Sequence, residues 1–359
     1  MRVPARLSNT QKAVCWGSAH VEQGRAYSTA ADSGCFVNSL RLSRAQALTD
    51  GDSEPWSPFN GSGLVPEVPT AIMWLIEEAE ARFANHTGLD LDLALQLAQL
   101  NSVAYCHAEN VAAWNCTRCH RRATGFLPEA VVFDLGWDLF GYAGYSPALA
   151  AMVVAFRGTD SHSLYNWAEN MRYWRTDLHV PFPDAENALV HTGFFVSYNN
   201  SSLEPNMTAA VRAMAARHPG APLYAIGHSM GAAMATIAAL DLKFKANLSD
   251  VRLVTFGSPR VGNDVFARFL QSQTTMSVRF THDRDIVPAW PPTWVGFHHV
   301  ATEIWQVDFG LGSVLGVCDD SGEDPRCHNS VCFLGLCTSI SDHLLYLGAH
   351  MYNDQLAPC

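Results

Sequence analysis

The sequence contains 359 residues with a formal net charge of −11 at pH 7, and 48% of its residues are hydrophobic. A chain of this size can bury one large core, so we expect a single main domain. The acidic balance disfavours nucleic acid and strongly anionic membranes as partners. No run of 18 apolar residues occurs, so no transmembrane segment is predicted.

The first 65 residues differ in composition from the rest. They carry Arg2, Arg6, Arg25, Arg41 and Arg44 among many Ser and Ala and few acids. No apolar segment follows this basic start, which is more typical of a transit peptide than of a secretory signal. We interpret residues 1–65 as a disordered, processed or non-native segment and residues 66–359 as the main domain.

Cysteines and glycosylation sequons indicate an oxidising, secretory environment. The chain has ten cysteines, a number that favours disulfides over reduced thiols. Seven Asn-x-Ser/Thr sequons begin at Asn60, Asn85, Asn115, Asn199, Asn200, Asn206 and Asn247. Zinc at Cys116 and Cys119 is an alternative, but no second Cys-x-x-Cys pair follows. We expect a secreted or lumenal protein with no metal and no cofactor.

The apolar run 148–156 predicts a fully buried strand. Gly158 follows it and allows the backbone to turn closely past a neighbour. The N–H and hydroxyl of Thr159, together with the N–H of Met230, are therefore candidates to hold a developing oxyanion. The alternative is a simple turn threonine.

Residues 161–171 predict a short amphipathic helix. Leu164, Trp167 and Met171 form one apolar stripe with Ala168, and polar side chains occupy the other face. Such a stripe is typical of a helix packed into the core. Its position after Thr159 favours a mobile lid that covers a site.

Residues 223–240 run from an apolar strand through Gly227-His228-Ser229-Met230-Gly231 into an alanine-rich helix. This is the context of a nucleophile elbow, in which glycines permit a sharp turn and backbone N–H groups face developing negative charge. We expect an exposed Ser229 hydroxyl. His228 is interpreted as a structural or supporting residue.

A serine nucleophile requires a base, and the base requires a carboxylate, in the chain order Ser, Asp, His for this turn. Residues 277–282 alternate as a strand and lead into a polar loop that holds Asp283 and Asp285. We choose Asp285, with Asp283 as the rival.

The base is predicted at His343, which begins a short apolar segment near the C-terminal end of the sequence. The chain has 15 histidines, and most must be structural. Its close rivals are His298, His299 and His350.

These motifs together resemble the fungal-type class 3 lipase family. The resemblance rests on the elbow and on residues 153–160 (VVAFRGTD), 190–194 (VHTGF), 254–263 (VTFGSPRVGN) and 285–288 (DIVP), and it extends over about residues 68–359. One departure is Ala232, where many relatives have glycine, and we expect it to alter helix packing only slightly.

The resemblance implies an α/β-hydrolase fold with a mostly parallel central sheet flanked by helices and a short helical lid. It implies a triad of Ser229, Asp285 and His343 with Thr159 in the oxyanion position. It also implies a terminal disulfide between Cys106 and Cys359. We expect Cys116 to pair with Cys119, and Cys318, Cys327, Cys332 and Cys337 to pair among themselves.

The function implied by the resemblance is hydrolysis of lipid carboxylic esters, foremost acylglycerols such as triacylglycerol, at a lipid–water interface. Phospholipase A1 and feruloyl-type esterase activities remain alternatives within the same chemistry. An inactive binding protein with this fold is a remote alternative, because a serine, an aspartate and a histidine occur in the required order.

Overall fold

The computed structural model describes residues 12–15, 21–22, 25–26, 83–159, 177–179, 185–309, 312–332, 337–353 and 359. The chain divides into a larger unit, Leu91–Trp305 with Cys318–Cys359, and a smaller unit, Met1–Asp90 with Gln306–Val317. The expected lid helix at 161–171 and the expected boundary near residue 65 lie outside the described residues.

The larger unit is built on a central sheet. Its strands are β4 (Leu127–Asp134), β5 (Leu139–Ser146), β6 (Ala151–Phe156), β9 (Leu223–His228), β10 (Val251–Phe256), β11 (Met276–His282) and the first part of β12 (Glu303–Phe309). Their order in space is β12-β11-β10-β9-β6-β5-β4. Strands β6, β9, β10 and β11 pair in parallel, whereas β4 and β5 pair antiparallel at one side.

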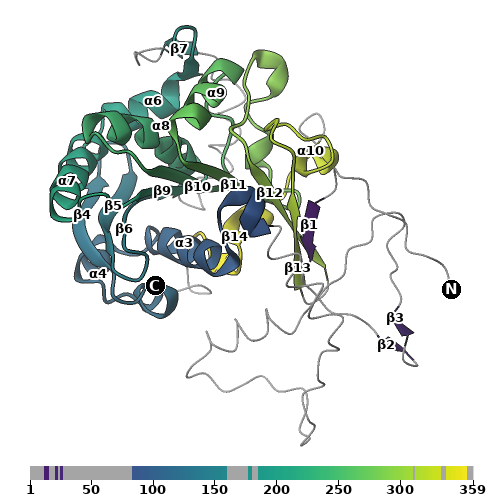
Figure 1. Ribbon diagram of the computed structural model, residues 1–359, viewed down its shortest axis with the longest axis horizontal. Coiled ribbons are helices and arrows are strands. Elements are labelled where there is room, and N and C mark those ends of the chain that lie inside the picture. The colour runs from purple at the N-terminus through teal and green to yellow at the C-terminus, as the bar shows by residue number, and fades with distance from the viewer. Residues whose placement is uncertain are drawn as a thin grey trace, which may run out of the picture. The chain divides into compact units, whose positions relative to one another are not determined.

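Helices cover both faces of this sheet. Those of the larger unit are α3 (Leu91–Val103), α4 (Ala108–Ala113), α6 (Thr192–Asn199), α7 (Leu203–Arg217), α8 (Met230–Lys245), α9 (Asp264–Gln273) and α10 (His328–Val331). Figure 1 shows α6, α7, α8 and α9 on one face and α3 on the other. Burial on two faces explains why β6 and β9 are continuous apolar runs without alternation.

Strand β6 begins later than the sequence predicted. The expected strand starts at residue 148, but the structure starts it at Ala151. The Ala150 amide donates to the Pro147 carbonyl, and Ala150 has φ 48°, so these residues form the turn that joins β5 to β6. The apolar character of 148–150 therefore reflects a tight turn and not additional strand.

Many of the buried residues of helix α8 are small, beside the larger Met234, Ile237, Leu240 and Leu242. Ala232, Ala235, Ala238 and Ala239 are all fully buried. Ala235, Ala238 and Ala239 belong to the main core cluster with residues of β6, β9 and β10. Short side chains allow the helix axis to approach the strands, which positions the first turn of α8 directly after β9.

Smaller elements complete the described residues. In the larger unit, β7 (Asp177–His179) pairs with β8 (Leu189–His191), and β14 (Leu345–Tyr346) pairs with β15 (Ala349–His350). In the smaller unit, β1 (Lys12–Cys15) pairs antiparallel with β13 (Gly312–Val317), and β2 (Val21–Glu22) pairs with β3 (Arg25–Ala26). Among the helices that the structure describes, none combines the length and apolar character needed to cross a membrane.

Four disulfide bonds link cysteines of the larger unit: Cys106–Cys359, Cys116–Cys119, Cys318–Cys327 and Cys332–Cys337. The first joins the segment after α3 to a residue 253 positions later. The second occupies both sulfur atoms of the Cys-x-x-Cys pair, which leaves no thiolate there to bind zinc.

Candidate active site

Ser229 lies in the turn between β9 and α8 with φ 59° and ψ −129°, a conformation that side chains other than glycine rarely adopt. The two glycines around it are required by contact. A Cβ atom on Gly227 would collide with the Gly231 backbone, and one on Gly231 would lie 2.6 Å from the Arg157 carbonyl oxygen. The sequence therefore forces the serine into a sharp elbow.

The Ser229 side chain is buried, with 0% of the residue exposed. The expectation of an exposed hydroxyl was wrong, because the loop after β6 passes directly over the serine. A Cβ atom added to Gly158 would lie 2.7 Å from the Ser229 Cβ and 2.8 Å from the His228 carbonyl oxygen. Within the described part of the chain, the buried Ser229 Oγ has no hydrogen-bond partner.

Asp285 and His343 form a tight, fully buried pair. The His343 Nδ1 lies 2.8 Å from one Asp285 carboxylate oxygen and 2.9 Å from the other. The Tyr346 hydroxyl donates to the same carboxylate at 2.5 Å, and the Val287 amide donates at 2.8 Å. Gly257, with φ 55°, leaves room for the pair, since a Cβ there would lie 2.8 Å from Asp285.

These contacts keep the Asp285 carboxylate ionised. Burial by itself raises the pKa of Asp285, but the charge and hydrogen bond of His343, together with the Tyr346 and Val287 donors, lower the pKa overall. An ionised carboxylate accepts, so the His343 Nδ1 carries a proton and its Nε2 can receive one. That Nε2 is buried and, like the Ser229 Oγ, has no partner among the described residues.

His228 supports His343 from within the elbow. The two rings have centroids 4.3 Å apart, and the His228 Nε2 donates to the His343 carbonyl at 2.7 Å. The His228 Nδ1 then accepts from the Tyr105 hydroxyl at 2.5 Å, while the Gly158 amide donates to the same hydroxyl at 3.0 Å. Burial, with the nearby His343 charge, lowers the pKa of His228 well below its usual value, so the ring is neutral.

The proposed oxyanion residues flank the serine. Thr159 follows Gly158 on the loop after β6, and its hydroxyl lies 4.0 Å from the Met230 sulfur. Met230 is the first residue of α8, where backbone N–H groups lack partners within the helix. The expected lid residues Leu164, Trp167 and Met171 lie outside the described residues.

The rival residues named from the sequence were Asp283, His298, His299 and His350. Asp283 is partly exposed and lies 3.4 Å from the ring of His282. The His299 Nε2 donates to the Pro288 carbonyl, and the His298 Nδ1 donates to the His299 carbonyl. His350 is exposed. The structure thus brings Asp285 together with His343.

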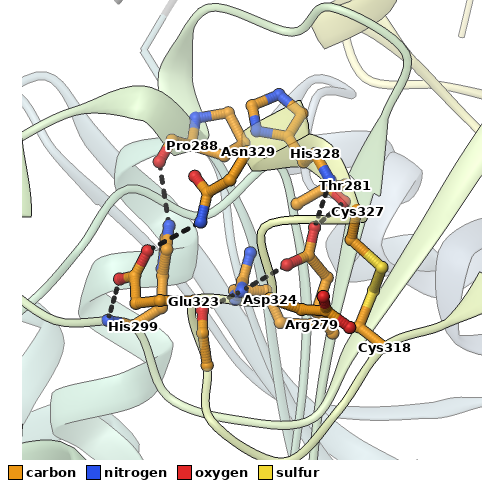
Figure 2. Close-up of polar contacts among 12 residues, drawn as sticks. Arg279, Thr281, Pro288, His299, Cys318, Glu323, Asp324, Cys327, His328 and Asn329 are labelled. Carbon is orange, nitrogen blue, oxygen red and sulfur yellow. Dashed lines mark hydrogen bonds and ion pairs between the residues drawn. A yellow bond between two sulfur atoms is a disulfide. The ribbon is translucent and has the colours of Figure 1, made fainter. Parts of the chain in front are cut away.

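A buried ion pair fixes the strand that leads to Asp285. The Arg279 guanidinium lies 3.0 Å from the Glu303 carboxylate, which also accepts from the Thr281 hydroxyl at 2.6 Å. The amide of His328 also donates to Glu303, and Figure 2 draws His328 together with Arg279 and Thr281. These contacts hold the end of β11 and, with it, the start of the Asp285 loop.

The Asp285 loop itself is held through its backbone. The His328 Nε2 donates to the Asp285 carbonyl at 2.9 Å. The His299 Nε2 donates to the Pro288 carbonyl at 2.8 Å (Figure 2). Burial lowers the pKa of both histidines, so each remains a neutral donor. Sequence reasoning missed these supports and also Tyr105 and Tyr346, because no local motif marks them.

The sheet is mostly parallel, and a Gly-x-Ser-x-Gly elbow follows one of its central strands. The aspartate and histidine of the buried pair come later in the sequence. These features together define an α/β-hydrolase. The model of the lipase (class 3) family matches residues 153–294. A secreted mono- and diacylglycerol lipase of Fusarium solani is 31% identical over 274 residues, 73% of this chain and 77% of that protein. The chain belongs to the class 3 lipase family, which confirms the resemblance drawn from the sequence.

Solved structures confirm the expected fold. The triacylglyceride lipase of Rhizomucor miehei superposes with a TM-score of 0.62 at 29% identity, covering 71% of this chain and 93% of that one. A fungal lipase–inhibitor complex that served as a model for interfacial activation gives a TM-score of 0.62 at 28% identity, covering 72% and 95%. The chain spans 66% of the curated Rhizomucor miehei lipase and 61% of that of Rhizopus niveus, each 31% identical.

Proposed function

We propose that the protein hydrolyses carboxylic esters of lipids, with acylglycerols at a lipid–water interface as its substrates. The observation that carries this proposal is a pair of buried, unpartnered atoms among the described residues, the Ser229 Oγ and the His343 Nε2. Unpaired buried polar atoms are costly and require a reason. A nucleophile and a base that meet on substrate binding supply that reason.

In the proposed mechanism, the Ser229 Oγ attacks the ester carbonyl carbon while the His343 Nε2 takes the hydroxyl proton. The Asp285 carboxylate holds the Nδ1 proton and stabilises the imidazolium that forms. Collapse of the tetrahedral intermediate breaks the bond to the alcohol, which leaves with the proton from the Nε2. Water, deprotonated by the same nitrogen, then attacks the acyl-enzyme, and release of the fatty acid restores Ser229.

The oxyanion of the intermediate is assigned to the backbone N–H groups of Thr159 and Met230. Met230 follows Ser229 at the start of α8, and Thr159 follows Gly158, which approaches the Ser229 side chain on the loop after β6. The helix N-terminus favours negative charge at this point. Each preorganised donor would lower the barrier by about 3 to 4 kcal/mol.

The acylglycerol substrate and the secretory location are also part of the proposal. Relatives named mono- and diacylglycerol lipase and triacylglyceride lipase support this substrate class. The net charge of −11 suits a neutral lipid better than an anionic one. Four disulfides suit an oxidising compartment, and the Fusarium solani relative is named a secreted enzyme.

The test is a hydrolysis panel of tributyrin, emulsified triolein, phosphatidylcholine and methyl ferulate, with p-nitrophenyl butyrate as the soluble ester. We expect the highest rates on acylglycerols. Ser229→Ala and His343→Ala should each slow hydrolysis by about 10⁴-fold or more.

His299→Ala is the matched control, because this buried histidine contacts the Pro288 carbonyl and not the serine. It should lower stability more than the rate per folded molecule. Retention of more than about a tenth of the activity by Ser229→Ala would refute the serine mechanism. A preference for phosphatidylcholine or methyl ferulate would refute the acylglycerol assignment alone.

A further inference from the structure

Three large apolar side chains are exposed at the end of β4 and in the turn that joins β4 to β5. Phe133 is 45% exposed, Leu135 is 82% exposed and Trp137 is 46% exposed. We call these three residues the hairpin tip. Turns of this kind usually carry Asn, Asp, Gly or Ser, so two bulky apolar residues flanking Gly136 are unusual in water.

Hydrogen bonds to Asp134 hold the turn in a conformation that exposes the side chains of the hairpin tip. One Asp134 carboxylate oxygen accepts from the amides of Gly136 at 3.1 Å and Trp137 at 3.2 Å. The other accepts from the amide and hydroxyl of Ser202 at 2.8 and 2.9 Å. The turn is thereby fixed to the start of α7, with the Leu135 side chain held away from the core.

The acidic groups beside the hairpin tip are already engaged. The four donors above occupy the Asp134 carboxylate. The Arg157 guanidinium lies 2.8 Å from the Asp138 carboxylate and 5.6 Å from the centre of the Phe133 ring. Charges that are hydrogen-bonded or paired oppose contact with an apolar phase less than free charges do.

Strand register places the hairpin tip at the same edge of the sheet as the elbow. Gly141 of β5 is paired with Phe156 of β6, and Phe156 is paired with Gly227 of β9. The turn before β5 and the serine after β9 therefore lie at the same level. Two strand spacings separate them, a distance of about 10 Å across the sheet.

We propose that the hairpin tip inserts into a neutral lipid surface and holds the Ser229 edge of the sheet against it. This inference rests on the proposed function, since it names the surface from which the ester is drawn. Transfer of Leu135 and Trp137 into lipid removes exposed apolar area from water. Tryptophan suits the boundary because its indole N–H can remain hydrated while its rings are buried.

The test measures binding separately from turnover. The substitutions Leu135→Ser and Trp137→Ser together make the hairpin-tip variant, which is built in the inactive Ser229→Ala protein. The partition of this protein onto phosphatidylcholine-coated triolein droplets is measured by flotation. We expect partitioning to fall about tenfold or more. The same pair of substitutions in the chain with Ser229 intact should leave hydrolysis of soluble p-nitrophenyl butyrate unchanged.

Leu127→Ser is the matched control. Leu127 is 57% exposed at the opposite end of β4, where it is paired with Tyr145, away from the elbow edge. Its substitution removes the same side chain and should leave partitioning unchanged. Phe244→Ser, at the far end of α8 from Ser229, is a second control with an exposed aromatic ring.

Equal losses of droplet partitioning in the hairpin-tip variant and in Leu127→Ser would overturn the proposal. Unchanged partitioning of the hairpin-tip variant would overturn it as well. A concentration-dependent dimer that disappears in the hairpin-tip variant would assign these side chains to a second copy of the chain instead. A protein that partitions onto triolein through the hairpin tip but hydrolyses none would refute the proposed function and leave this inference standing.

Discussion

The Tyr105 hydroxyl lies 2.5 Å from the His228 Nδ1, which connects the segment after α3 to the elbow. The same hydroxyl accepts from the Gly158 amide, and His228 donates to the His343 carbonyl. One buried hydroxyl thus links the loop that carries Thr159 to the backbone of the proposed base. Its contribution is positional, since it fixes two groups that act on the same substrate in the proposed mechanism.

Tyr105→Phe should therefore lower kcat on a soluble ester by about tenfold to a hundredfold, because it leaves two buried groups without a partner. Tyr142→Phe is the matched control. Its buried hydroxyl donates to the Leu100 carbonyl, outside the site. Both variants should lose thermal stability, but only the first should lose kcat. Equal losses of kcat would show that Tyr105 acts through general stability.

Gly257→Ala should impair catalysis more than folding. The residue has φ 55°, and a Cβ would lie 2.8 Å from Asp285, 2.9 Å from the His343 Nδ1 and 2.9 Å from the Tyr346 hydroxyl. The pair must then separate, so kcat should fall by at least about a hundredfold.

Gly220→Ala provides the control for Gly257→Ala. Gly220 has a similar positive φ of 79°, but a Cβ there would contact nothing within 4 Å. It carries the same conformational cost of about 1 to 2 kcal/mol without the collision. Stability measured by urea unfolding should drop in both variants, with kcat per folded molecule retained only in Gly220→Ala.

Stability should decline as the pH falls below about 6.5. Burial lowers the pKa of His299 well below its usual value, and the neighbouring charges of Arg279 and Arg260 lower it further. The unfolded chain then binds a proton near pH 6.5 that the folded chain does not bind, so protonation favours unfolding. His228 and His328, whose pKa values are also lowered by burial, add to the effect.

The check is the urea midpoint of His299→Gln and of the parent protein at pH 8 and pH 5. The glutamine cannot gain a proton, so the decline between these two pH values should be smaller in the variant. Asp285 does not contribute in this window. Its pKa is lowered, so its stabilisation is complete above its unfolded value of 3.8 and is lost only at lower pH. An identical decline in both proteins would contradict the assignment.

Cys359→Ser should destabilise the domain strongly. The Cys106–Cys359 bond closes a loop of 253 positions, for which chain entropy predicts about 5 kcal/mol. Cys119→Ser opens a loop of only 3 positions and should cost about 2 kcal/mol. Thermal unfolding of the two variants under oxidising conditions measures the difference. A larger effect from the short loop would show that local geometry outweighs chain entropy.

The candidate triad residues could be chosen from local sequence, whereas the residues that support them could not. Ser229 could be identified because two glycines and a strand-to-helix transition are contiguous in the chain. Asp285 and His343 followed from the required order and from the resemblance to relatives. The roles of these residues in catalysis stay predictions, as does a lid at Leu164, Trp167 and Met171.

The remaining features depend on packing between distant segments. Tyr105 and His228 are 123 positions apart, and Tyr346 and Asp285 are 61 apart, so no local pattern reports their contact. The burial of Ser229 depends on the path of the loop at Gly158. The start of β6 was placed too early because apolar turn residues and apolar strand residues look alike in sequence.

The bond between Cys106 and Cys359 makes the chain between them a covalent ring. Ser229, Asp285 and His343 all lie on that ring, so a single proteolytic cut within it would separate no member of the proposed triad from the others. A molecule cut once within the ring would remain one covalent species until the disulfide is reduced. The chain could therefore be cut at an exposed turn such as the one at Gly220 while the disulfide keeps the two pieces joined.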